Sequence, residues 1–213
     1  SALAANPSTR QQAEILAAME EYLPFFLNSL EQDGYCSEGI GYWNYGFGHF
    51  IMLSDVTYRA TGGKLDLLAN EQAQRGALFA KRIQIVPGAY PIFADGWTGT
   101  RAANHYVNYL AARMEGKKLS QEDLHLLWPA ASTLYENLIF FTDDNAARFP
   151  TQSLLEDMEA HPLRSWFPVA GVLVARLPDP GENTLAVAMK GGHNAEQHNH
   201  NDVGSYVVTV GEH

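Results

Sequence analysis

The chain has little of what would cross-link it, carry it into a membrane or bring it to nucleic acid. Its one cysteine among 213 residues, Cys36, rules out a disulfide within the chain. No apolar run reaches the roughly 20 residues that a membrane-spanning helix needs. Lys and Arg number 14 against 24 Asp and Glu, for a formal net charge of −10. The composition therefore predicts neither a nucleic-acid partner nor a membrane partner.

What the chain does have is apolar material for a core. Hydrophobic residues make up 46% and charged residues 18%, a balance typical of globular proteins. The apolar pattern changes along the chain from helical spacing to the β-branched runs of strands. We expect a helical part at 1–142, a linker with a short helix at 143–163 and the first strands of a sheet at 164–213. Helices followed by strands indicate an α+β protein with two domains.

Apolar residues at helical spacing predict five helices, at residues 8–32, 43–61, 64–86, 101–115 and 120–141. Ser8 opens a capping-box pattern at the start of the first helix, and Pro24 should kink or break that helix. Two glycines, Gly62 and Gly63, should end the second helix. Residues 88–100 are predicted to form a loop.

Alternating and β-branched residues predict strands at 165–167, 171–177, 184–189 and 205–210. The turn at 178–183 is rich in Pro, Asp and Gly, and it should join the middle two strands as a hairpin. A sheet this small buries little surface and leaves its edges exposed. We therefore expect it to rest on the helices, on further chain or on a second copy in a homodimer.

The most polar stretch of the chain lies between the last two predicted strands. Residues 190–206 read KGGHNAEQHNHNDVGSY and hold three of the eight histidines; we call them the histidine loop. His198 and His200 are two residues apart, so their imidazoles point the same way in extended chain. Such a pair can share a metal or bracket a substrate. With the polar side chains between and around them, the histidines predict a functional site; these side chains are Asn194, Asn199, Asn201 and Asp202.

A second unusual stretch follows the first predicted helix. Residues 33–46 read DGYCSEGIGYWNYG and combine glycines with three phenols; we call them the tyrosine loop. Glu38 is placed to accept hydrogen bonds from the amides of this loop. Because buried tyrosines are common in cores, the spacing alone leaves packing and catalysis both open for Tyr42 and Tyr45.

Both loops resemble motifs of the heparinase II/III-like polysaccharide lyases and the related oligoalginate lyases. The tyrosine loop is similar to their aromatic loop, and the histidine loop to the signature at the start of their C-terminal β-domain. Residues 166–168 and 171–173 resemble the first strands of that domain, and the likeness runs in order from about residue 10 to 213. It implies a partial (α/α) toroid of about five helices, followed by the first strands of an antiparallel β-sandwich, with the active site between them.

The resemblance also implies a chemistry, which is β-elimination at a uronic acid in an acidic polysaccharide or oligosaccharide. Tyr42 matches the phenol that serves as base and acid, with Tyr45 as the alternative alignment. His198 matches a histidine of the catalytic cleft, and His200 matches a ligand of a structural zinc. The expected substrate contacts are Glu38, Trp43, Asn44, His193, Asn194 and Asn199. Members of this family favour the bacterial periplasm or the cell exterior.

The chain also departs from the family pattern. A catalytic Asn, often with His, is expected upstream of the tyrosine loop, yet the 41 residues before Tyr42 hold no such pair. The remaining zinc ligands, an Asp and a His, are expected beyond His213. We therefore interpret the chain as an internal part of a lyase, inactive by itself, whose zinc is bound in the full-length protein.

Two other functions remain open. His198, His200 and Asp202 partly match the His-x-His-x-Asp of metallo-hydrolases with the β-lactamase fold, but that motif continues with His where this chain has Val203. That fold also begins with strands. The other alternative is a non-catalytic carbohydrate-binding module, in which sugars stack on aromatic side chains; the candidates are Tyr42, Trp43, Tyr45 and Trp97. The sequence does not choose among alginate, heparin-like and other uronate polymers.

Overall fold

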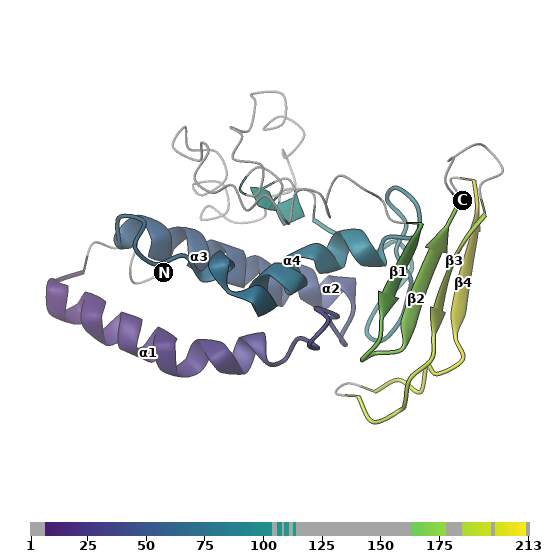
Figure 1. The fold of residues 1–213 in the computed structure, drawn as a ribbon, viewed down its shortest axis with the longest axis horizontal. Helices are drawn as coiled ribbons and strands as arrows, with labels where there is room; N and C mark the ends of the chain where they lie inside the picture. Colours follow the sequence, from purple (N-terminus) through teal and green to yellow (C-terminus); the bar gives the residue numbers. More distant parts are fainter. Residues whose placement is uncertain are drawn as a thin grey trace.

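The computed structural model describes residues 7–103, 106, 107, 109, 110, 113, 163–177, 185–196 and 199–211. Three long helices lie together, and the strands stand side by side at one end of them (Figure 1). This arrangement confirms the α+β class. The helices expected at 120–141 and in the 143–163 linker lie outside the described residues. The helix expected at 101–115 is helical at its described positions from 106 onward, but 101–103 are not helical.

The first helix, α1 (Thr9–Leu27), begins as predicted. Ser8 accepts the backbone N–H of Gln11 through its side chain, and the Gln11 side chain accepts the N–H of Ser8 at 3.0 Å, so the capping box is confirmed. The helix continues through Pro24 but ends at Leu27 rather than near residue 32. A proline within the last turn removes one backbone donor and weakens that turn, in keeping with the earlier end.

The second helix begins earlier than predicted. It runs without a break through α2 (Ile40–Tyr42), the π-helical turn η2 (Trp43–Phe47) and α3 (Gly48–Ala60). The helix therefore includes Ile40–Tyr42, three residues ahead of its predicted start at residue 43. Gly62 and Gly63 follow with φ of 60° and 83°, so the predicted end is confirmed.

The third helix is shorter than predicted. A 3₁₀ turn, η3 (Leu67–Ala69), comes first, and α4 (Glu71–Ile83) starts only at residue 71 instead of 64. The reason is a cap: the Asn70 side chain accepts the N–H groups of Gln72 and Ala73 at 2.9 and 3.2 Å. Residues 88–100, predicted to be a loop, contain no helix or strand.

The four strands are confirmed, with bounds within two residues of those predicted. They are β1 (Arg164–Phe167), β2 (Val172–Arg176), β3 (Leu185–Lys190) and β4 (Tyr206–Val210), paired antiparallel in sequence order. Met189 pairs with Tyr206, so the histidine loop leaves and re-enters the sheet at the same end.

One face of the sheet packs on the helices. Its buried residues are Phe167, Val172, Val174, Ala186 and Ala188. The Phe167 ring lies 5.2 Å from that of Tyr35 and 6.0 Å from that of Phe79, so it joins β1 to the tyrosine loop and to α4. Arg176 on β2 donates to the carbonyls of Arg82 and Gln84 at the C-terminal end of α4.

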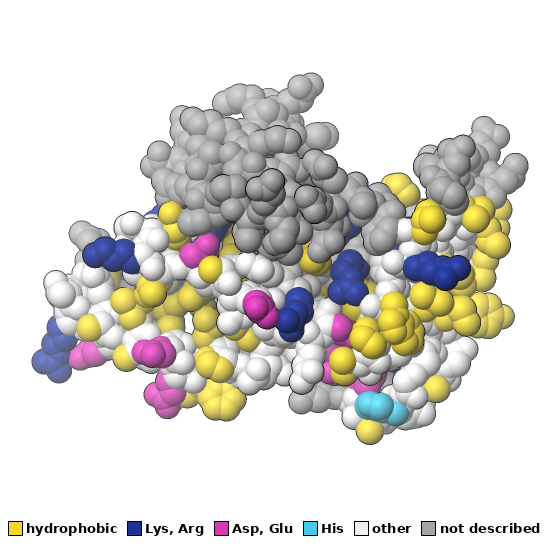
Figure 2. Space-filling model, viewed as in Figure 1, with side chains coloured by type: hydrophobic (Ala, Val, Ile, Leu, Met, Phe, Trp, Pro, Cys, Tyr) yellow, Lys and Arg dark blue, Asp and Glu magenta, His cyan; other side chains and the backbone are white. Residues whose placement is uncertain are grey.

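The opposite face of the sheet is apolar and exposed. Its side chains include Trp166, Leu185, Met189, Tyr206, Val208 and Val210, each 48–69% exposed. Figure 2 shows hydrophobic side chains gathered over the sheet. Among the described residues, no helix combines the length and apolar character needed to cross a bilayer.

Candidate functional site

The tyrosine loop is anchored at its start by Asp33. One oxygen of this carboxylate accepts the N–H of Tyr35, and the other accepts the N–H of Val169 in the turn between β1 and β2, both at 3.0 Å. Gly34 follows with φ of 86° and its Cα against the backbone of Arg75 in α4. The loop is thus fixed to both the sheet and the helices.

The two candidate phenols lie at the start of a π-helical turn and within it. Tyr42 precedes this turn and is 44% exposed, and Tyr45 lies within it and is 69% exposed. Short π-helical turns are rare and are found frequently at functional sites. Both phenols are therefore accessible, on a backbone feature that is itself associated with function.

Trp43 lies between them but faces the core. It is 1% exposed, and its indole N–H donates to the carbonyl of Gly76 at 2.8 Å. Its burial contradicts the expectation that it contacts substrate. The reason is the helical turn, which sends neighbouring side chains to different sides, whereas a loop would have allowed all of them to face solvent.

Tyr42 and Glu38 line a small hollow of about 60 Å³, with Ser29 and Ser37 as its other polar residues. This volume suits one or two water molecules and excludes a sugar ring. The predicted substrate contact of Glu38 therefore lies beside Tyr42, in a hollow too small to be the sugar site.

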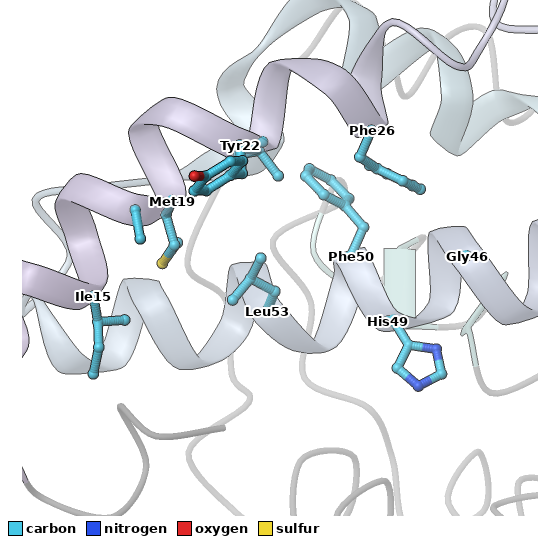
Figure 3. Close-up of a pocket in the computed structure, with 10 residues that line it drawn as sticks. Ile15, Met19, Tyr22, Phe26, Gly46, His49, Phe50 and Leu53 are labelled. Atoms are coloured by element: carbon cyan, nitrogen blue, oxygen red, sulfur yellow. The ribbon is translucent and has the colours of Figure 1, made fainter.

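A larger apolar cavity of about 480 Å³ lies between α1 and α3. Figure 3 shows side chains of both helices lining it; the labelled ones include Ile15, Met19, Tyr22, Phe26, Phe50 and Leu53. Phe26 and Gly46 line both this cavity and the hollow beside Tyr42. The two spaces are therefore neighbours, but the larger one is lined mainly by apolar side chains, whereas the smaller one also has polar lining residues.

His49 is a neighbour of Tyr45 that the sequence reading missed. Its ring lies 4.8 Å from the Tyr45 ring, and its Nδ1 lies 2.5 Å from the Tyr45 carbonyl oxygen. Residues four apart meet on one face of a helix, so the spacing from 45 to 49 was the available signal. The predicted helix at 43–61 contained both residues, but the sequence reading considered Tyr45 only as part of the tyrosine loop.

Asn44 holds the segment 93–103, which we call the bridging segment. Its side-chain amide donates to the carbonyl of Arg101 at 2.7 Å, and its oxygen accepts the N–H of Ala103 at 2.8 Å. Asn44 was predicted to contact substrate. In the structure both its polar groups are engaged by this backbone.

The bridging segment follows the tyrosine loop from one glycine to the next. A Cβ at Gly39 would lie 3.1 Å from the carbonyl oxygen of Phe93, and one at Gly41 would lie 3.6 Å from the methyl group of Thr100. Gly39 also has φ of 89°, a conformation that favours glycine. The close approach of the two segments therefore depends on residue 39.

The histidine loop contacts the same segment from the other side. His200 Nε2 lies 2.5 Å from Asp95 Oδ1, and Asp202 Oδ2 accepts the N–H of Ala94 at 2.6 Å. The His200 side chain is 45% exposed, so it remains accessible while paired. The bridging segment thus brings both predicted motifs to one region of the molecule.

The base of the histidine loop is held by a buried ion pair. Lys190 Nζ contacts Glu196, and their side chains are 3% and 6% exposed. The ammonium also lies 5.8 Å from the centre of the Tyr35 ring. A loop that otherwise faces solvent is therefore fixed to the start of the tyrosine loop.

The other predicted residues of the histidine loop lie at the surface. His193 accepts the N–H of Ala195 at 3.1 Å, and Asn194 is exposed. Asn199 donates to the Asn201 side chain and accepts its N–H. These contacts are local. His198, the predicted cleft histidine, lies outside the described residues.

Burial and neighbouring charge alter three groups near these loops. Burial, then repulsion from Asp33 and Glu196, raises the pKa of Glu31. Burial raises the pKa of the Tyr35 phenol well above its usual range and that of the Cys36 thiol to about 12. Neither Tyr35 nor Cys36 is therefore suited to acid–base or nucleophilic work near neutral pH.

Metal binding was predicted for His200. Within the described residues, no three His, Cys, Asp or Glu side chains gather as a metal site would require. His200 and Asp95 supply two donors, whereas a structural zinc takes four, so these residues do not by themselves fit a complete zinc site.

No protein-family model matches the chain, and no curated protein matches it either.

Proposed function

We propose that the protein is a polysaccharide lyase that cleaves a uronate-containing glycan by β-elimination. The observation that carries this proposal is the meeting of the two motifs. The tyrosine loop holds the bridging segment through Asn44, and the histidine loop holds it through His200 and Asp202. Two motifs far apart in sequence therefore serve one region, as a shared site requires.

The reaction needs one group that removes a proton and returns it. The base takes the proton from C5 of the uronate, the C5–H electrons form the C4=C5 double bond, and the C4–O4 bond breaks. The departing O4 then takes up a proton. In this proposal Tyr42, whose side chain is exposed, performs both transfers: its phenolate takes the C5 proton, and the phenol so formed gives that proton to O4.

The remaining roles follow the resemblance. His198 belongs to the cleft, and Tyr45, paired with His49, is the second candidate phenol. Asn44 holds the bridging segment. Glu38, His193, Asn194 and Asn199 are the proposed substrate contacts. We assign the binding of the substrate carboxylate to none of the described residues.

A zinc ion completes the proposal in the intact protein. A histidine that binds a metal through one ring nitrogen often donates a hydrogen bond from its other ring N–H to a carboxylate. The pairing of His200 Nε2 with Asp95 leaves Nδ1 for a metal, whose other ligands would lie outside the described residues. When bound, zinc would supply structural cross-linking of the β-domain.

The finer architecture proposed is a toroid followed by a β-sandwich. A row of side chains crosses the outer face of the sheet in register, from Trp166 through Leu173 and Met189 to Tyr206. This apolar row suits a second sheet packed about 10 Å away. Likewise, apolar grooves of about 480 and 570 Å³ flank α1, as further toroid helices would require.

The test is turnover by the intact protein on alginate, heparin and hyaluronan, followed by the ultraviolet absorbance of the unsaturated product. Because general acid–base catalysis contributes roughly 10²- to 10⁴-fold, Tyr42→Phe should lower kcat by at least about 100-fold. Tyr45→Phe changes the alternative phenol and should retain most activity if Tyr42 is the catalytic one; the reverse result would give the role to Tyr45. Full activity in Tyr42→Phe would overturn the assignment.

A non-catalytic carbohydrate-binding module is the second candidate. The observation favouring it is the exposure of several aromatic rings near the bridging segment, Tyr42, Tyr45 and Trp97 at 44, 69 and 68%. Glycan binding without turnover of any of the three polymers would favour this function over the lyase.

A further inference from the structure

Two residues of the bridging segment and the histidine loop adopt an unusual backbone conformation. Among the described residues, Ala94 and Asn201 are the two non-glycine positions with positive φ, at 54° and 56°. This left-handed conformation is unfavourable for alanine, whereas asparagine adopts it more readily. Such residues persist where surrounding contacts hold them, and they cluster at ligand sites.

Both strained residues belong to the same junction. The N–H of Ala94 donates to Asp202, the residue after Asn201. The next residue on one side, Asp95, pairs with His200, the residue before Asn201. Phe93, the residue before Ala94, anchors the bridging segment in the core, since it is 4% exposed. The junction therefore ties two successive residues of the bridging segment, Ala94 and Asp95, to the histidine loop.

The firmly held segment carries an outward turn. It touches the tyrosine loop near Gly39 through Phe93 and near Gly41 through Thr100. Between these contacts the N–H of Thr100 donates to the carbonyl of Trp97 at 3.0 Å, which closes a turn. Trp97 is 68% exposed at this turn, and Thr100 at the end of the turn lies near Gly41, the residue before Tyr42.

We propose that Trp97 is a sugar-binding residue, the platform of a subsite next to Tyr42 for one pyranose ring of a uronate oligosaccharide. The proposal rests on the proposed function for its ligand class. The flat indole offers a large apolar surface to the C–H groups on one face of a sugar ring, and its N–H offers a hydrogen bond. A platform fixed before binding loses little conformational freedom when the ligand arrives.

The test is binding and turnover of alginate, heparin and hyaluronan tetrasaccharides by the intact protein. Binding is measured by calorimetry in the Tyr42→Phe background, where turnover does not interfere. Trp97→Ala should weaken binding about tenfold, equivalent to about 1.4 kcal/mol, and should raise KM far more than it lowers kcat. Trp97→Phe keeps an aromatic ring and should recover part of the loss. Ile92→Ala, which removes a 51% exposed side chain near the same turn, is the control and should change neither constant.

The outcomes separate this proposal from the lyase. If Trp97→Ala leaves Kd and KM unchanged in an active enzyme, the subsite is wrong and the lyase stands. If the protein binds a tetrasaccharide through Trp97 but turns over none of the three polymers, the lyase is wrong and the subsite stands. If no tetrasaccharide binds, both are wrong. Circular dichroism melting shows whether Trp97→Ala still folds; if it does not, Trp97→Phe and Trp97→Leu decide on the same measurements.

Discussion

At the scale of single residues, several side chains expected to meet substrate hold the protein's own backbone instead. Trp43 donates to Gly76, and Asn44 binds Arg101 and Ala103. The sequence identified the stretch in which they lie, but a residue type alone does not say which way its side chain points. For Tyr42 and Tyr45 the sequence left packing and catalysis open, and both side chains are exposed.

The buried ion pair of Lys190 and Glu196 gives a prediction at this scale. Glu196→Gln leaves a buried ammonium without its counter-charge, which should cost about 3–5 kcal/mol of unfolding free energy. Lys190→Met combined with Glu196→Leu replaces both charges by apolar groups and should recover most of that loss. Urea unfolding measures both.

A matched control for this pair lies on α1. Glu14→Gln breaks the exposed pair with Arg10, whose side chains are 61% and 89% exposed, and should cost well under 1 kcal/mol, as is usual for surface pairs at about 0–1 kcal/mol. Equal losses for Glu14→Gln and Glu196→Gln would contradict the buried role of Lys190 and Glu196.

At the scale of elements, helix caps and apolar spacing predicted those features that depend on residues close together in the sequence. The capping box of α1, the glycines after α3 and the four strands all follow from residues within a few positions of one another. The early end of α1 follows from Pro24, and the late start of α4 follows from the Asn70 cap. In both places the apolar spacing continues beyond the helix end, so the spacing alone predicts a longer helix. The π-helical turn had no sequence signal.

The contact of the tyrosine loop with α4 gives a prediction for this scale. Gly34 has φ of 86°, and a Cβ there would lie 2.3 Å from the carbonyl oxygen of Arg75, which is backbone and has little room to move. Gly34→Ala should therefore separate the loop from α4 and destabilise the protein by more than the roughly 1 kcal/mol due to backbone conformation alone.

Gly62 provides the control, because it shares the positive φ of Gly34 but has no close backbone neighbour. Gly62 has φ of 60°, and a Cβ there would meet nothing within 4 Å. Gly62→Ala should show the conformational cost only. The difference between the melting temperatures of the two variants measures the contribution of the close approach between Gly34 and Arg75. Equal melting temperatures would mean that this approach is not needed.

At the scale of the whole molecule, arginine side chains join the sheet to the helices. Arg176 donates to the carbonyls of Gln84 and Arg82 and to Ser165 Oγ. Burial lowers the pKa of its guanidinium to about 10, so it remains charged at neutral pH. Arg82 in turn donates to the carbonyls of Asp33 and Trp166. Arg82 and Arg176 therefore hold the sheet against the helical part.

Arg176→Met should weaken that interface. Partly buried carbonyl groups at the end of α4 would lose their donors, each at a cost of up to about 1–3 kcal/mol. Amide hydrogen exchange should increase along β2 and at the C-terminal end of α4. Arg164→Met, at an exposed position on β1, is the control and should leave exchange unchanged. Unchanged exchange in Arg176→Met would show that packing around Phe167 suffices to hold the sheet.

The sequence by itself determined the α+β order, the strands, the caps and the two motifs, because these depend on side chains close together along the chain. Only the tertiary structure decided that Trp43 is buried, that Asp95 pairs with His200 and that one segment joins both motifs. These outcomes depend on partners about 30 to 110 residues apart, often backbone groups, such as Trp43 with Gly76 and Ala94 with Asp202. A backbone carbonyl or N–H carries no residue identity, so no pattern in the sequence marks it as the partner.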